Sequence, residues 1–247
     1  MSDLLLDIET LPRTASIGYD VARLGPPGWA GPVDRPVPRK SCPANYTDPA
    51  KIAAWEAAED VRHAAAVASD VDVQRAEAVD HWRRGALHWS TVRIGCIGWT
   101  TDGRANVIDA EAIGERAAIS RLLDAAGDKH LVWTWGSYDA WVIRAVSVRL
   151  GIHPGPLVSA GKPWERRHRD LQAGWAGWLG SGEREIRGIS VREVAAFVGV
   201  AGLVGSGAEV LDCYLGGRWG EVLAHCAGDV AVEWELLTLL RRLGGVE

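Results

Sequence analysis

Two carboxylates separated by one residue stand near the start of the chain, in the apolar run from Asp3 to Thr10. Successive side chains of a β-strand point to opposite faces, so a strand here places Asp7 and Glu9 on one face. Two such acids repel each other unless protons or cations neutralise them, and their oxygens favour Mg²⁺ or Mn²⁺. The alternative is a buried strand that runs into an acidic turn without binding any metal.

Further acids lie at positions that could bring them to the same place. Asp139 begins a predicted helix that follows an apolar strand, and Asp229 lies in the long final helix. His225 precedes Asp229 by one helical turn, so both side chains face the same way. Because sites in α/β sheets gather at the carboxyl ends of strands, we expect Asp7, Glu9 and Asp139 to lie at such ends.

The elements that must position these residues follow from hydrophobic periodicity and from capping signals. Apolar strands alternate with helical patterns, which predicts an α/β sheet flanked by helices. The Ser190 to Glu193 spacing predicts a capping box at a helix start. The expected elements are the strands Leu4–Asp7, Thr91–Trp99, Ala105–Ile108 and His130–Trp135, and the helices Glu111–Ala126, Asp139–Leu150, Ser190–Gly199 and from Trp219 onward.

Residues 13–90 separate the first two strands and are interpreted as an insertion. Its first half is rich in proline and glycine, so no regular element is expected there. A cap at Asp48 followed by Pro49 predicts a helix from Pro49 to about Ala68. Residues 70–84 form either a second helix or its continuation, with Ser69 and Asp70 as the candidate break.

Composition bounds the class of protein. A chain of 247 residues with 47% hydrophobic residues can bury one substantial core, and a net charge of −5 argues against a general polyanion-coating protein. Its four scattered cysteines fit neither a zinc site nor a disulfide framework. No basic leader precedes the first strand and no apolar run reaches about 18 residues, so we expect a cytoplasmic protein without membrane partners.

The order of these acids resembles the DEDD superfamily of 3′–5′ exonucleases, which have an RNase H-like fold. The likeness is greatest to the proofreading exonuclease domains of family B DNA polymerases and to their stand-alone relatives, including phage ones. It spans nearly the whole chain, including the insertion. Besides the acids it rests on the segments Leu5–Thr10, Cys42–Pro49, Gly136–Asp139, His168–Leu171, Ser190–Gly199 and Ala224–Val230.

The resemblance implies one RNase H-like exonuclease domain over residues 1–247 with the insertion at 13–90. It implies two ions of Mg²⁺ or Mn²⁺, with Asp7 bridging both. Glu9 and Asp229 would bind the water-activating ion, Asp139 would act on the second through water, and His225 would orient the nucleophile. The implied substrates are single-stranded or mismatched 3′ ends of DNA in replication proofreading or repair, with a DNA polymerase as partner in trans.

The chain departs from the family pattern in two places. His225 occupies the position where tyrosine-type members carry Tyr, four residues before the last Asp. The Asn expected ahead of the second Asp is replaced by Thr134 or Trp135, and the Pro after it by Trp141. A histidine is the commonest general base, so hydrolysis remains the expectation.

Candidate substrate-binding residues are Thr10, Leu11 and Tyr138. Leu11 matches the position of an apolar wedge against the terminal base in relatives, or is a core residue. Tyr138 could stack on a base or pack in the core. Arg166, Arg167 and Arg169 could contact phosphates or form a solvated loop face.

Two competing functions remain open from the sequence. An exoribonuclease of the same superfamily is one, because no residue is identified that reads a 2′-hydroxyl. The other is a catalytically silent RNase H-like module that binds nucleic acid or a polymerase, which the substitution by His225 would support.

Overall fold

The computed structural model describes residues 3–15, 26–27, 29–33, 35–45, 47–84, 92–127, 131–157, 167–180, 189–203 and 205–246. The chain divides into two compact units. One unit comprises Met1–Gly18 with Gly85–Glu247, and the other is Tyr19–Arg84. The second unit lies within the range 13–90 that the sequence marks as an insertion.

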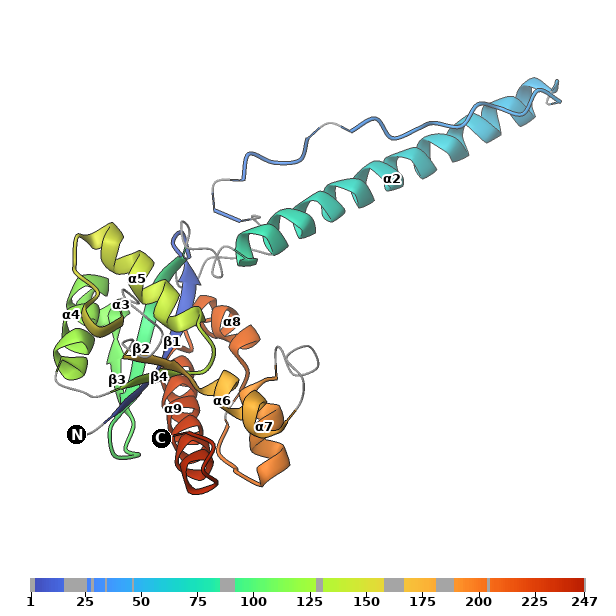
Figure 1. Ribbon diagram of the computed structural model, residues 1–247. Coiled ribbons are helices and arrows are strands. Elements are labelled where there is room, and N and C mark those ends of the chain that lie inside the picture. The colour runs from blue at the N-terminus through green and yellow to red at the C-terminus, as the bar shows by residue number, and fades with distance from the viewer. Residues whose placement is uncertain are drawn as a thin grey trace. The chain divides into compact units, whose positions relative to one another are not determined.

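The larger unit is built on a five-stranded mixed sheet with the strand order β3-β2-β1-β4-β5 (Figure 1). Strand β2 is antiparallel to both β1 and β3, whereas β4 is parallel to β1 and to β5. The α/β class and the hairpin of β2 and β3 are therefore confirmed. The strands are β1 (Leu4–Pro12), β2 (Val92–Thr100), β3 (Asn106–Asp109), β4 (Val132–Thr134) and β5 (His168–Asp170).

Helices cover both faces of this sheet (Figure 1). One face packs against α3 (Ala110–Ile113), α4 (Glu115–Ala126) and α5 (Tyr138–Leu150). The other packs against α6 (Leu171–Trp178), α7 (Val191–Val198) and α9 (Trp219–Arg242). The other elements in the described part of the unit are short, namely α8 (Val210–Leu215) and the 3₁₀ turns η2 (Gly155–Leu157) and η4 (Gly207–Glu209).

Alternation along β1 decides which way the acids point. Leu6 and Ile8 belong to the core under α4 and α5, whereas Leu5 belongs to the core under α6, α7 and α9. Because alternate residues of a strand share a face, Asp7 and Glu9 lie on the Leu5 side, toward α9. The predicted common face is therefore the one that the final helix covers.

The structure corrects three expectations about these elements. Asp7 and Glu9 lie within β1, which continues to Pro12, and not at its carboxyl end. The helix expected over Glu111–Ala126 is interrupted at Gly114, whose φ of 85° an ordinary residue rarely adopts. Strand β4 covers only Val132–Thr134 of the expected His130–Trp135. Position 130, and position 91 at the start of the expected second strand, lie outside the described residues.

The smaller unit consists of the helix α2 (Pro49–Arg84) and an extended segment bonded to it. Helix α2 runs without a break through Ser69 and Asp70, so of the two expected alternatives the continuous helix is confirmed and the second helix is wrong. Asp70 accepts a hydrogen bond from Gln74 Nε2 at 2.6 Å. Gln74 also donates to the carbonyl oxygen of Val33 at 3.0 Å and accepts from its backbone N–H at 2.8 Å. The described parts of the proline-rich segment contain no helix or strand, as expected.

Glycines in β2 allow α9 to lie close to the sheet. A Cβ atom at Gly98 would lie 2.6 Å from Val230 Cγ2 and 2.9 Å from Cys226 Sγ. Both neighbours are buried side chains of α9, so neither can swing away. Gly98 is also the residue paired with Asp7 in the β1–β2 ladder. The close approach of α9 to Asp7 and Glu9 therefore depends on glycine at position 98, because a side chain there would collide with α9.

Replacing Gly98 by Ala should push α9 from the sheet and destabilise the fold by about 1–3 kcal/mol, the usual cost of overpacking a core. Denaturant unfolding measures this. The matched control is Gly220→Ala in α9 itself, where an added Cβ meets nothing within 4 Å. That control should be neutral or stabilising by up to about 1 kcal/mol. Equal stabilities of the two variants would show that α9 does not need this close approach.

None of the helices in the described part of the chain combines the length and the apolar composition needed to cross a lipid bilayer.

Candidate metal centre

The parallel pairing of β4 with β1 brings Asp139 to the acids of β1. Trp133 of β4 pairs with Leu5, and β4 ends one residue later at Thr134. The chain then leaves the sheet beside the next residues of β1, which include Asp7 and Glu9. Helix α5 starts at Tyr138, so Asp139 lies in its first turn and is buried, with 6% of its surface exposed.

Strand β5 holds the turn that presents Asp139. The backbone N–H of Gly136 donates to Asp170 Oδ1 at 3.1 Å, and Thr134 Oγ1 donates to the carbonyl oxygen of Gly136. Thr134 Oγ1 also lies 2.8 Å from His168 Nε2. Gly136 has a φ of 73°, which favours glycine at this point of the turn. His168 and Asp170 therefore stabilise the turn before Asp139 and are not members of the acidic cluster.

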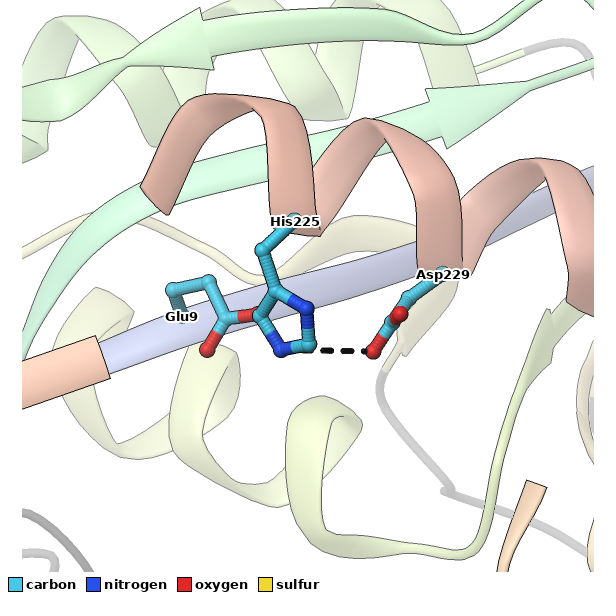
Figure 2. Close-up of side chains that lie close together, drawn as sticks. All are labelled: Glu9, His225 and Asp229. Atoms are coloured by element: carbon cyan, nitrogen blue, oxygen red, sulfur yellow. Dashed lines mark ion pairs between the residues drawn. The ribbon is translucent and has the colours of Figure 1, made fainter. Parts of the chain in front are cut away.

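Helix α9 supplies a histidine and an aspartate one turn apart (Figure 2). His225 Nε2 lies 3.3 Å from Glu9 Oε1 and 3.6 Å from Asp229 Oδ2. Figure 2 shows the imidazole between the two carboxylates. One possible ligand atom from each of the three residues lies within 4.8 Å of the others, so this cluster could hold a metal ion.

Burial raises the pKa of every predicted acid in the cluster, and repulsion by neighbouring carboxylates adds to the rise for Asp7, Glu9 and Asp139. Burial, followed by the charges of Asp139 and Glu9, raises the pKa of Asp7 well above its usual value. Burial and then Asp229 raise the pKa of Glu9 in the same direction, and that of Asp139 to about 8. Burial also raises the pKa of Asp229, although His225 and Arg192 oppose the rise. Each shift shows that negative charge is disfavoured here unless cations balance it.

Sequence reasoning missed a further acid, Glu233. It lies on α9 one turn after Asp229 and is 2% exposed. Burial, followed by the charges of Asp139 and Asp229, raises its pKa well above the usual value. The signal was present in the sequence, because His225, Asp229 and Glu233 repeat every four residues and so share a helical face.

The donor set of the cluster fits hard divalent cations. Asp7 Oδ2, Asp229 Oδ1 and Glu233 Oε2 are buried and lack a hydrogen-bond partner in the described part of the chain. Buried polar groups are nearly always paired, and a carboxylate left alone in a protein interior is costly. Oxygen atoms of this kind are the ligands that Mg²⁺ and Mn²⁺ prefer. The residues present therefore fit such ions.

The candidate substrate-binding residues lie beside the acids, with different exposures. Thr10 Oγ1 lies 3.4 Å from the Tyr138 hydroxyl oxygen, which joins β1 to the start of α5. Leu11 is fully buried, and a Cβ at Gly95 would lie 3.1 Å from its Cδ1 and 2.9 Å from Trp219, which favours the core alternative for Leu11. Arg167 donates to the carbonyl oxygens of Ala126 and Gly127, and Arg169 to that of His168. Arg166 lies outside the described residues.

No model of a known protein family matches the chain, and no curated protein matches it.

The raised pKa values predict how stability depends on pH without metal. A buried acid that titrates near 4 when unfolded and higher when folded keeps its proton longer in the folded state. Its stabilising effect is therefore complete below about pH 4 and is lost as the pH rises through the folded value, which is about 8 for Asp139. In chelator, the free energy of unfolding should fall between pH 5 and pH 8.

Denaturant unfolding at several pH values, with chelator and with excess Mg²⁺, measures this dependence. Added Mg²⁺ should stabilise the protein more at pH 8 than at pH 5, because cations then replace the missing protons. The double variant Asp7→Asn/Asp139→Asn is the control and should show a weaker dependence than the wild type, because Glu9, Asp229 and Glu233 remain. A wild-type stability in chelator that is constant over this range would contradict the interpretation.

Proposed function

We propose that this protein is a metal-dependent 3′–5′ exonuclease with an RNase H-like fold that hydrolyses phosphodiester bonds at the 3′ ends of single-stranded or mismatched DNA. The observation that carries the proposal is the convergence of four acids, of which Glu9 and Asp139 are buried, while Asp7 and Asp229 each have a buried oxygen without a hydrogen-bond partner among the described residues. They come from β1, α5 and α9, which lie far apart in the sequence. The resemblance depends on the order of the same residues.

Divalent cations at this cluster would activate water and stabilise the leaving oxygen of the phosphodiester. The implied mechanism uses two such ions, which the four acids would hold. His225 Nε2 lies within 3.6 Å of acids on both β1 and α9, so it can orient the attacking water and accept its proton. The imidazole thus takes the place of the tyrosine of the tyrosine-type relatives.

Aromatic rings beside Asp139 support binding of unpaired bases. Tyr138 and Trp141 lie on α5 with ring centroids 6.2 Å apart, and Trp141 is 38% exposed. Aromatic rings stack on any base, with a contribution of about 1–3 kcal/mol per base. The family pattern has a proline at the position of Trp141, so a base stacked on Trp141 would replace the contact that the proline makes in relatives. A DNA polymerase partner and a cytoplasmic location remain predictions.

The direction of digestion and the preferred sugar are tested with three oligonucleotides of one sequence. Single-stranded DNA labelled at the 5′ end should be shortened stepwise, giving a ladder of labelled products in Mg²⁺. The same DNA with a phosphorothioate block at its 3′ end should resist. Cleavage inside the blocked strand, or release of the 5′ label as a mononucleotide at the outset, would contradict 3′–5′ digestion. Faster shortening of RNA of the same sequence would identify an exoribonuclease.

A further inference from the structure

Arg192 is a cation at a place where α7 does not need one. It is the second residue of the helix, after the capping residue Ser190, and it is exposed. The start of a helix carries partial positive charge, so an acid such as Glu193 is favoured there and a basic side chain is not. The stability of α7 therefore does not account for an arginine at this position.

A main-chain contact holds the guanidinium group of Arg192 beside the candidate metal centre. Arg192 Nη2 donates a hydrogen bond to the carbonyl oxygen of Gly205. Gly205 lies next to His225, because a Cβ atom built on this glycine would be 3.9 Å from His225 Nδ1. The other ring nitrogen of His225, Nε2, lies 3.6 Å from Asp229 Oδ2. A continuous series of contacts thus leads from Arg192 to the acids.

The ionisation and the exposure of Asp229 agree with this placement. The charge of Arg192, after that of His225, opposes the rise in pKa that burial causes at Asp229. The side chain of Asp229 is 20% exposed, compared with 10% for that of Glu9. Arg192 therefore lies near an acid of the cluster that solvent, and hence a ligand, can reach.

Most of the hydrogen-bonding capacity of Arg192 is unused within the described part of the chain. A guanidinium group has five N–H donors, and one of those of Arg192 bonds to Gly205. No carboxylate of a described residue forms an ion pair with it, whereas Arg93 pairs with Glu111. The planar fork of N–H groups matches two oxygens of one phosphate. Arg192 is thus held in place and still able to bind an anion.

The charges of the cluster create a need for such a cation. A strand of nucleic acid that reaches the cluster meets the five carboxyl groups of Asp7, Glu9, Asp139, Asp229 and Glu233. Two divalent ions carry four positive charges, so five ionised carboxylates are not fully neutralised, and each phosphate brings a further negative charge. A cation beside Asp229 reduces this repulsion.

We propose that Arg192 binds a phosphate group of the substrate strand beside Asp229, through its guanidinium group and without contact to a base. This inference rests on the proposed function, because it requires a nucleic-acid strand at the cluster. It adds a phosphate contact to the base contacts of Tyr138 and Trp141. Because every nucleotide carries the same phosphate, the affinity that this contact contributes is independent of base sequence.

Affinity for single-stranded DNA, measured over a range of salt concentrations, tests the proposal. The full chain is titrated in Mg²⁺ against a fluorescent oligonucleotide with the phosphorothioate block at its 3′ end, and fluorescence anisotropy reports binding. Arg192→Ala should weaken binding by about tenfold or more, the scale of a hydrogen bond to a charged group. The slope of log affinity against log salt should become shallower by about 0.7, the value for one phosphate contact on a single strand. Strands of different sequence should lose the same factor.

Three further variants separate the charge of Arg192 from its contact with Gly205. Arg192→Gln can still donate to the carbonyl oxygen but carries no charge, so it should show the shallow slope of Arg192→Ala. Arg192→Lys keeps the charge and loses the planar fork, so it should keep the wild-type slope with a lower affinity. The matched control is Arg121→Ala, at an exposed arginine of α4 on the opposite face of the sheet, which should bind as the wild type does.

A wild-type slope in both Arg192→Ala and Arg192→Gln would overturn the proposal. If that slope accompanied slower digestion, Arg192 would serve only to anchor Gly205. If Arg192→Ala fails to fold by circular dichroism, the comparison of Arg192→Gln with Arg192→Lys decides, and equal slopes of these two variants would overturn the proposal.

Failure of this contact and failure of the proposed hydrolysis give different results. Binding of DNA with a slope that depends on Arg192, without digestion by the wild type, supports the contact and rejects the exonuclease. Digestion by the wild type, with unchanged affinity and slope in Arg192→Ala, rejects the inference and supports the exonuclease.

Discussion

Replacing Asp7 by Asn should lower the rate of DNA hydrolysis by at least about 10³-fold while the protein remains folded. Removal of a single group that stabilises a transition state electrostatically already costs about 10²–10³-fold. Asp7 is close enough to Glu9, Asp139 and Glu233 for each of their charges to raise its pKa, so its loss affects the whole cluster. The amide has nearly the same shape as the carboxylate. Single-turnover digestion of labelled single-stranded DNA measures the effect.

The matched control is Asp124→Asn, an exposed aspartate of α4. It should digest DNA at the wild-type rate. The Asp7→Asn protein should also be at least as stable as the wild type in chelator, because a buried carboxylate with raised pKa is removed. Activity of Asp7→Asn within a few-fold of the wild type would place the chemistry elsewhere in the molecule.

Replacing His225 by Ala should lower turnover by about 10²–10⁴-fold, the usual contribution of a general base. Its Nε2 lies between Glu9 and Asp229, where it can hold the attacking water. His225→Tyr should restore much of the activity, since tyrosine-type relatives use this position. Single-turnover rates at saturating metal separate these variants.

Two results would contradict this role of His225. Equal rates for wild type and His225→Ala, with Asp229→Asn inactive, would make the histidine a bystander. A His225→Ala protein whose whole defect disappears at high Mn²⁺ concentration would show that the imidazole binds the ion and does not act on water. The pH dependence of the rate is the second readout, because loss of a base should remove the limb of the profile that reports its deprotonation.

Those parts of the fold that depend on local signals could be predicted from the sequence. Alternation between apolar and acidic residues in β1 correctly placed Asp7 and Glu9 on one face. The capping box of Ser190 and Glu193 and the left-handed Gly199 correctly bounded α7. Each of these features depends on a few residues that are close in the sequence, so it can be predicted without knowing the tertiary structure.

Other elements depended on the tertiary structure and were missed or misplaced. Strand β5 has only the three half-buried residues His168–Asp170, which show no alternation, and the parallel pairing with β4 defines it. Helix α6 begins at an Asp170 cap, but Gly174 and Gly177 weaken its helical pattern. Gly174 lies close to α9, since a Cβ there would be 3.0 Å from Leu240 Cδ2.

The candidate site was predicted only as far as its residues matched a known order. Residue spacing paired Asp7 with Glu9 and His225 with Asp229, and the resemblance joined these pairs with Asp139, whereas Glu233 lies outside that pattern and was overlooked. Its contribution depends on the antiparallel packing of α9 against β1, which glycines of β2 permit. The four-residue spacing from His225 through Asp229 does set Glu233 apart from Glu235, which is exposed on the same helix, but that spacing alone does not show that Glu233 is buried.

Metal dependence of digestion is the most direct measurement of what this cluster does. With 5′-labelled single-stranded DNA, wild-type protein should give a ladder of shortened products in Mg²⁺ or Mn²⁺, stop when chelator is added, and resume when the ion is restored in excess. The double variant Asp7→Asn/Glu9→Gln should give no products under any of these conditions. Digestion that continues in chelator, and equally in the double variant, would contradict a carboxylate-bound metal centre.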